Sequence, residues 1–173
     1  MVASSCGGDG LGTISVSLDI DEQTIPGTAP PAVQGSCNSS VGSGTIDSLA
    51  PISLDLRDSR ELEGRSIFRF TVAILEEVRL AIVPPSQPFQ TWDFLDAISL
   101  FADDDPSDSD PPVLIARLDP VPRGVKQIVI PGTGTDISDI VSADTFTVTG
   151  QVRGRPPCAD VHFNGEAEFD VGF

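Results

Sequence analysis

Residues 161–173, which read VHFNGEAEFDVGF, decide the fold of this chain. Small or apolar residues occupy the odd-numbered positions: Val161, Phe163, Gly165, Ala167, Phe169, Val171 and Phe173. The positions between them carry His162, Asn164, Glu166, Glu168 and Asp170. Because successive side chains of a strand point to opposite faces, this alternation predicts a strand with one buried face. Such a strand needs a second layer against which its apolar face can pack.

The same period of two recurs towards the N-terminus. It is present in residues 13–21, 52–57, 68–74 and 145–149. In the third of these segments it places Phe68, Phe70, Val72 and Ile74 on one face. Shorter apolar runs fill residues 78–83, 97–102, 113–118 and 125–130. Together these patterns predict an all-β fold, an antiparallel immunoglobulin-like sandwich of about eight or more strands with little helix.

The segments between the expected strands carry turn signals. Four Pro-Pro pairs, at residues 30–31, 84–85, 111–112 and 156–157, prevent a helix or a central strand from continuing through them. Residues 22–50 are the least regular stretch, and we expect a long connection with one short edge strand near residues 45–49. Helical turns are expected only at residues 91–95 and at residues 136–141, where Asp136 or Ser138 can cap the turn.

The composition limits both partners and chemistry. A chain of 173 residues fits one domain with a sizeable core. Its 26 acidic and 10 basic residues give a formal charge of −16, so nucleic acid and anionic lipid are poor partners. One His and no Tyr are a thin supply of catalytic side chains, and we expect no enzyme. The sequence contains no run of about 18 apolar residues, so it predicts no membrane-spanning helix.

The N-terminus carries a second informative feature. Cys6 follows the small residues Ala3, Ser4 and Ser5 and precedes the spacer GGDG. This arrangement resembles the lipid-attachment site of bacterial lipoproteins, in which the thiol carries lipid. The resemblance implies that residues 1–11 are a flexible arm or lipid tether and that residues 12–173 form a single β-sandwich domain. It also implies a place at the outer membrane or cell surface, periplasmic or extracellular.

Residues 92–173 add a resemblance of their own. The segments FLDAISLFADD, VLIARL and DISDIVSADTF follow one another as strand, strand and short turn. In this order they resemble the C-terminal half of uncharacterised β-sandwich lipoproteins from bacteria. The motifs are structural, so the resemblance implies the sandwich and no activity.

The three cysteines allow three different single disulfides. If Cys6 carries lipid, Cys37 and Cys158 remain as a pair. Both lie in segments rich in Gly, Ser and Pro, where a bridge can close without distorting a strand. The expected Cys37–Cys158 disulfide implies an oxidising compartment, whereas the alternative is a reduced, unpaired set.

An acidic loop is the strongest candidate site in the sequence. Within residues 103–110, carboxylates at Asp103, Asp105, Asp108 and Asp110 suit a hard cation such as Ca²⁺. The spacing of an EF-hand is not met, because its sixth and twelfth positions would be Asp108 and Leu114. We therefore expect at most weak Ca²⁺ binding and no other cofactor. The alternative is a solvated loop whose charge keeps sheet edges apart.

Three further groups have competing interpretations. His162 is expected on the exposed face of the last strand, without a nucleophile beside it. Trp92 and Phe94 could form a sugar-binding platform, although core packing is favoured. The basic island Arg153-Gly154-Arg155 could meet an acidic neighbour, including another copy of this protein, or compensate charge locally.

The sequence thus favours a non-enzymatic binding or structural protein on the bacterial cell surface or in the periplasm, anchored by lipid at Cys6. Its expected partners are the membrane, through the lipid anchor, and other copies of itself or another surface protein. The alternative function is a subunit of an extracellular assembly, a filament or coat, ordered through its N-terminal arm.

Overall fold

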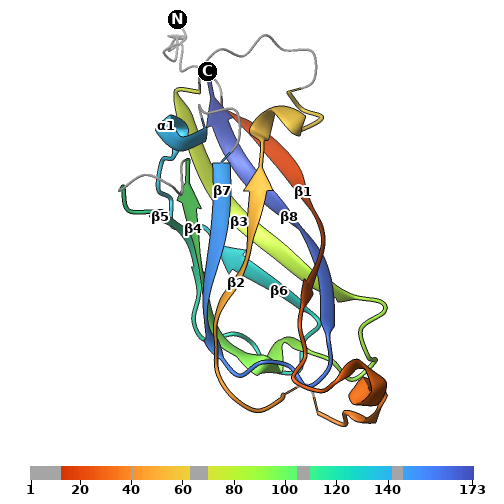
Figure 1. Cartoon of the computed structure of the whole chain (residues 1–173). Coiled ribbons are helices and arrows are strands. Elements are labelled where there is room, and N and C mark those ends of the chain that lie inside the picture. The colour runs from red at the N-terminus through yellow and green to blue at the C-terminus, as the bar shows by residue number, and fades with distance from the viewer. Residues whose placement is uncertain (1–12, 40, 63–69, 105–109, 142–145) are drawn as a thin grey trace, which may run out of the picture.

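The computed structural model describes residues 13–39, 41–62, 70–104, 110–141 and 146–173. Eight strands form two four-stranded antiparallel sheets, which confirms the all-β sandwich (Figure 1). The strands are β1 Ile14–Ile25, β2 Ile46–Leu54, β3 Val72–Val83, β4 Leu95–Asp103, β5 Val113–Leu118, β6 Gln127–Pro131, β7 Phe146–Gly154 and β8 Val161–Gly172. Short helical turns are η1 Pro31–Ser36, η2 Leu56–Asp58, η3 Trp92–Phe94 and α1 Ser138–Val141.

The strand order identifies the kind of sandwich. One sheet has the order β1-β8-β3-β6 and the other β2-β7-β4-β5. Strand β1 pairs with β8, β2 with β7, β3 with β6, and β4 with β5, as if one long hairpin had been wrapped into two layers. This is the order of a jelly roll. An immunoglobulin sandwich instead keeps its first two strands in one sheet, whereas here β1 and β2 lie in different sheets.

Strand β8 lies where the alternation of residues 161–173 predicts. It is paired on both sides, with β1 and with β3. The odd-numbered side chains Val161, Phe163, Ala167, Phe169 and Val171 are all buried. The ring of Phe169 meets the ring of Phe146 from the facing sheet edge to face, with centroids 6.1 Å apart. The strand is therefore a central element of the core, as its sequence predicts.

In strand β3 the buried residues differ from those predicted. The expected inward set included Val72 and Ile74, but both are only half-buried, and the buried residues are Ala73 and Leu75. The chain bends at Thr71, which shifts the alternation by one residue after the buried Phe70. Phe68 lies outside the described residues. A register shift after Leu75 then changes the phase again, so that Val78 and Leu80 point inward further along the strand.

The expected edge strand and the expected strand from residue 52 are one element, β2. A register shift between Leu49 and Ile52 accommodates Ala50 and Pro51. Because β2 is an edge strand, Pro51 costs no hydrogen bond of a central ladder. The predicted helical turns at residues 91–95 and 136–141 are found as η3 and α1.

The structure contains the predicted disulfide. Cys37 and Cys158 are bonded, with their Cα atoms 6.0 Å apart. The bridge joins the connection between β1 and β2 to the connection between β7 and β8, at the end of the sandwich opposite α1 (Figure 1). Cys6 lies outside the described residues, as do residues 1–11 as a whole.

Candidate functional site

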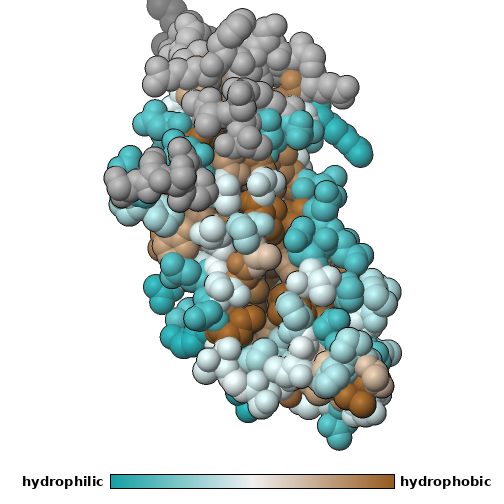
Figure 2. All heavy atoms as spheres, viewed as in Figure 1, coloured by the Kyte–Doolittle hydropathy of each residue, from teal (hydrophilic) through white to brown (hydrophobic). Residues whose placement is uncertain are grey.

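The two long sides of the sandwich differ. On one side the edge strands β5 and β6 are linked, because Ala116 bridges Gly132 and the backbone N–H of Thr133 donates to Ile115 O at 2.8 Å. On the other side lie the edges of β1 and β2, and we call this side the open edge. Figure 2 shows hydrophobic atoms between the sheets here, flanked by hydrophilic ones.

An acidic cleft of about 520 Å³ lies at the open edge, between β1 and the segment that follows β2. Its carboxylates are Asp19, Asp21, Asp55, Asp58, Glu61 and Glu166. Within the described part of the chain, Arg60 is the one basic residue that lines it. Volumes of roughly 300–1,000 Å³ are typical of ligand sites. The cleft therefore has the size of a binding site and a strong excess of negative charge.

Two separate segments supply the walls of the cleft. Strand β1 alternates, with buried Leu18 between the outward residues Ser17 and Asp19. The other wall comes from residues 53–61, which include the end of β2 and η2. Leu18 and Leu54 also line the cleft, but both are buried, so the surface that a ligand would meet is mostly polar. Carboxylates on two walls suit a ligand with several separated cationic groups.

Like charges face each other in the cleft. Asp19 on β1 and Glu166 on β8 are directly opposite in the antiparallel register, and both line the cleft. Carboxylates opposite each other on one face of a sheet repel. Arg79 on β3 relieves part of this repulsion, since its Nη1 lies 3.9 Å from Glu166 Oε2. Among the described residues Asp19 forms no such ion pair, so a bound cation would offset the repulsion further.

Ser59 is an unusual member of the lining. Ser59 is 3% exposed, and among the described residues its hydroxyl oxygen has no hydrogen-bond partner. A buried hydroxyl without a partner costs roughly 1–3 kcal/mol relative to a satisfied one. The wall of the acidic cleft therefore contains a hydroxyl group that the described residues leave unsatisfied.

The carboxylates of the cleft do not form a metal centre. Among the described residues, no group of three or more His, Cys, Asp or Glu side chains is placed to hold a metal ion. Carboxylates spread along a cleft suit an extended organic cation better than a single ion. For the predicted Ca²⁺ loop, Asp103 and Asp110 are described, but Asp105 and Asp108 lie outside the described residues. Weak Ca²⁺ binding there stays a prediction.

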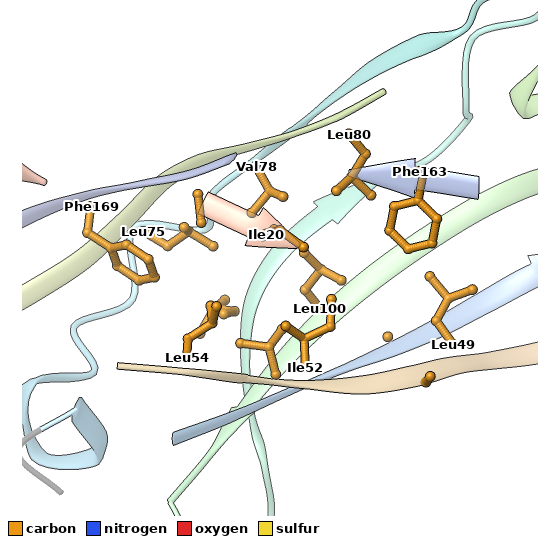
Figure 3. A pocket seen from close by; sticks show the side chains of 15 residues that line it. Ile20, Leu49, Ile52, Leu54, Leu75, Val78, Leu80, Leu100, Phe163 and Phe169 are labelled. Carbon is orange, nitrogen blue, oxygen red and sulfur yellow. The ribbon is translucent and has the colours of Figure 1, made fainter. Parts of the chain in front are cut away.

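An apolar slot lies between the sheets next to the acidic cleft, and Leu54 lines both (Figure 3). Side chains from both sheets converge on it, among them Ile20, Leu80, Leu100 and Phe163. Its cavity volume is about 30 Å³. Because ligand sites are roughly tenfold larger, we interpret the slot as part of the core packing.

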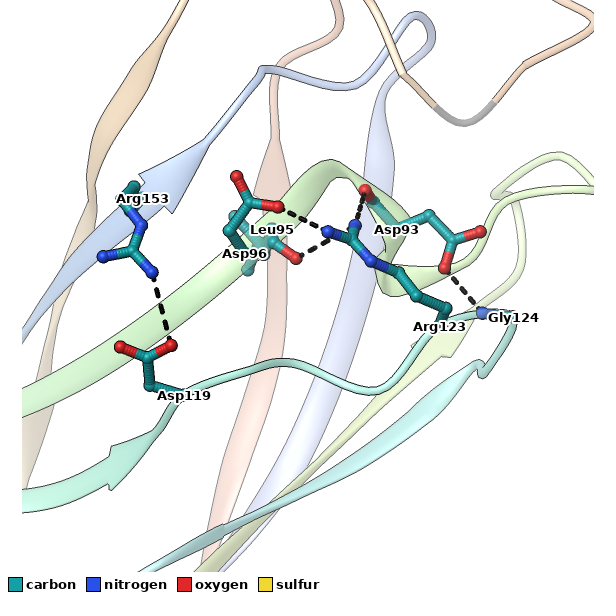
Figure 4. A network of polar contacts seen from close by, with 7 residues as sticks. All are labelled: Asp93, Leu95, Asp96, Asp119, Arg123, Gly124 and Arg153. Carbon is teal, nitrogen blue, oxygen red and sulfur yellow. Dashed lines mark hydrogen bonds and ion pairs between the residues drawn. The ribbon is translucent and has the colours of Figure 1, made fainter.

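A polar network fixes the connection between β5 and β6 to the start of β4 (Figure 4). Arg123 donates to the backbone oxygen of Asp93 and pairs with the carboxylate of Asp96, and the backbone N–H of Gly124 donates to Asp93 Oδ1 at 2.6 Å. Beside it, Arg153 Nη2 lies 3.3 Å from Asp119 Oδ1. Arg153 of the basic island thus meets an acidic neighbour of its own chain, as local charge compensation predicts.

Two aromatic predictions are also resolved. Trp92 and Phe94 are buried at 0% and 1% exposure, so they pack in the core and form no exposed platform. His162 is half-buried and contacts the neighbouring strand. Its Nδ1 lies 3.1 Å from both Glu22 Oε1 and Thr24 Oγ1 on β1. It ties β8 to β1.

The acidic cleft is not evident from the sequence alone. The sequence shows acidic residues at positions 19–22 and 55–61, but only the strand order brings these distant segments together.

Comparison with known proteins gives no further indication of function. No family model matches the chain, and no curated protein is significantly similar. No helix in the described residues is long and apolar enough to cross a membrane.

Proposed function

We propose that this chain is a non-enzymatic binding protein of the bacterial cell surface or periplasm, tethered by lipid at Cys6, that binds cationic ligands in its acidic cleft. The observation that carries the binding function is the cleft itself, with six carboxylates on its two walls. The disulfide supports a compartment outside the cytoplasm, because such bonds persist in oxidising surroundings.

The chemistry of the cleft favours binding over turnover. Its described lining offers fixed negative charge, two leucines and hydroxyl groups, and His162 lies elsewhere, on the contact with Glu22 and Thr24. These groups can hold a cation and orient it by charge and hydrogen bonds. The alternative function, an assembly subunit ordered through residues 1–11, depends on residues outside the described part of the chain.

Calorimetric titration with spermine tests the proposed binding. Spermine carries several separated ammonium groups, which match the carboxylates on the two walls of the cleft. The variant Asp19→Asn/Asp58→Asn should weaken binding by about tenfold, because it removes one carboxylate from each wall. The control Asp47→Asn/Asp104→Asn changes the net charge equally, but neither residue lines the cleft.

Equal loss of binding in both double variants would attribute the affinity to the overall charge of −16 and contradict a site at the cleft. No binding of spermine to the wild-type protein at about 50 mM salt, where screening is modest, would also contradict it.

A further inference from the structure

The acidic cleft runs along a strand that, within the described residues, is paired on one side only. Strand β1, Ile14–Ile25, pairs with β8 and forms the edge of its sheet. An edge strand presents backbone donors and acceptors to any extended segment that reaches it. Building on the proposed function, we propose that the cation bound here is a basic, extended peptide segment of a partner protein, which adds to the sheet beside β1.

The spacing of the cleft residues on β1 fits this mode of binding. Ser17, Asp19 and Asp21 all line the cleft and stand at every second position. An added strand has the same period, so every second side chain of it lies on the same face of the sheet as these three residues and next to them. A segment with Lys or Arg at every second position would therefore place a positive charge beside each carboxylate. The intervening side chains would point towards the inner side of the sheet edge.

The opposite wall completes the recognition. The charged end of each Lys or Arg side chain would lie among the carboxylates of the two walls, and the intervening side chains would face the inner side of the sheet edge, where Leu18 and Leu54 are buried. Ser59 lies in this wall, and its buried hydroxyl has no hydrogen-bond partner among the described residues. The unpartnered hydroxyl and the free strand edge are independent observations, and they point to the same place.

Charge also selects the partner. A second copy of this chain, with a formal charge of −16, would be repelled from an edge that carries Asp19 and Asp21. The same carboxylates attract a basic strand, so they discriminate against self-association while they favour a partner of opposite charge. Strand addition gives affinity through the backbone and specificity through the alternate side chains.

Three probes separate strand addition from simple charge attraction. The first is a peptide that alternates Thr and Lys. The second has the same number of Lys residues, but Pro replaces the central Thr, which removes a backbone donor and disfavours pairing. The third is spermine, which has charge but no peptide backbone. The full-length protein is titrated with each probe by calorimetry, and its hydrogen exchange is measured with and without the first peptide.

We expect the alternating peptide to bind at least about tenfold more tightly than the Pro peptide and than spermine. We also expect slower amide exchange in residues 15–21 and no change in β5, the edge strand on the closed side. The variant Asp19→Asn/Asp21→Asn should weaken the alternating peptide, whereas Asp47→Asn/Asp104→Asn should not.

Equal affinity for the two peptides, or protection that does not include residues 15–21, would overturn strand addition and leave cation binding in place. Binding of none of the probes would overturn both proposals. Stronger binding of spermine than of either peptide would assign the acidic cleft to small polyamines instead of a protein strand.

Discussion

The carboxylate of Asp136 accepts a hydrogen bond from the backbone N–H of Ala73, with Oδ1 and N 3.0 Å apart. The same oxygen accepts from the backbone N–H of Ser138, also at 3.0 Å. One side chain therefore holds the connection after β6 against β3 and caps the start of α1. The hydrogen bond from Ala73 favours the ionised carboxylate and lowers the pKa of Asp136 below its ordinary value of 3.8.

A lowered pKa gives a specific dependence of stability on pH. The contribution of Asp136 is fully present above the unfolded value near 3.8 and is lost as the pH falls through the lower folded value. Asp136→Asn should cost about 1 kcal/mol at pH 7, because a neutral amide oxygen accepts the two backbone hydrogen bonds more weakly than a carboxylate does. Urea denaturation of both proteins at pH 7 and pH 3 measures it.

The difference between wild type and Asp136→Asn should shrink at the lower pH, because protonation weakens the wild-type carboxylate as an acceptor. Asp47→Asn, on an exposed position of β2, serves as the control and should show no such pattern. A difference that is constant with pH would contradict the assigned role of the ionised group.

Reduction of the Cys37–Cys158 bridge should destabilise the sandwich substantially. The bridge spans 121 residues of sequence, and closing a loop of that length is worth about 4–5 kcal/mol in the chain-entropy model. Urea denaturation of Cys37→Ser/Cys158→Ser against wild type measures the loss. Non-reducing peptide mapping should recover a Cys37–Cys158 peptide, and a peptide that links Cys6 to either residue would contradict the pairing.

Phe169 is expected to contribute more stability than any exposed aromatic residue. Its side chain is 0% exposed in the middle of β8, so Phe169→Ala should cost roughly 3–5 kcal/mol through lost burial and the cavity left behind. Phe89 is 37% exposed, and Phe89→Ala should change stability far less. Similar denaturation midpoints for the two variants would show that β8 does not form the core.

Local patterns in the sequence predict individual strands well. Alternation alone identified β8 and the first part of β1, and the apolar run at residues 113–118 has the bounds of β5. Alternation failed in β3, because the bend at Thr71 and the register shift after Leu75 change which residues face inward. Neither irregularity has a distinctive residue such as Gly or Pro at its position.

The strand order and the acidic cleft depend on contacts between distant segments. Alternation shows which face of a strand is buried, but not which strand lies beside it, so jelly-roll and immunoglobulin orders predict the same pattern. The cleft brings Asp19 together with Asp58, and both belong to segments that look like ordinary solvated acidic positions in the sequence. Only the placement of β1 and η2 on the same side of the sandwich joins them.

The last prediction separates the two candidate functions of the N-terminus. Expressed behind a lipoprotein signal peptide in a bacterial host, the protein should be recovered in the membrane fraction, and Cys6→Ser should release it as a soluble, folded monomer. Cell fractionation followed by size-exclusion chromatography measures both. The matched control is Ser5→Ala, which leaves the thiol in place and should remain with the membrane.

An assembly subunit would behave differently. Cys6→Ser would then stay in high-molecular-weight material, and deletion of residues 1–11 would break that material down, because the arm would act as a docking element. We rank the lipid anchor first on energetic grounds. Ordering each backbone residue costs roughly 1–2 kcal/mol, and the glycines at positions 7, 8 and 10 offer no side chain to offset that cost. A tether avoids the cost, because it functions without becoming ordered.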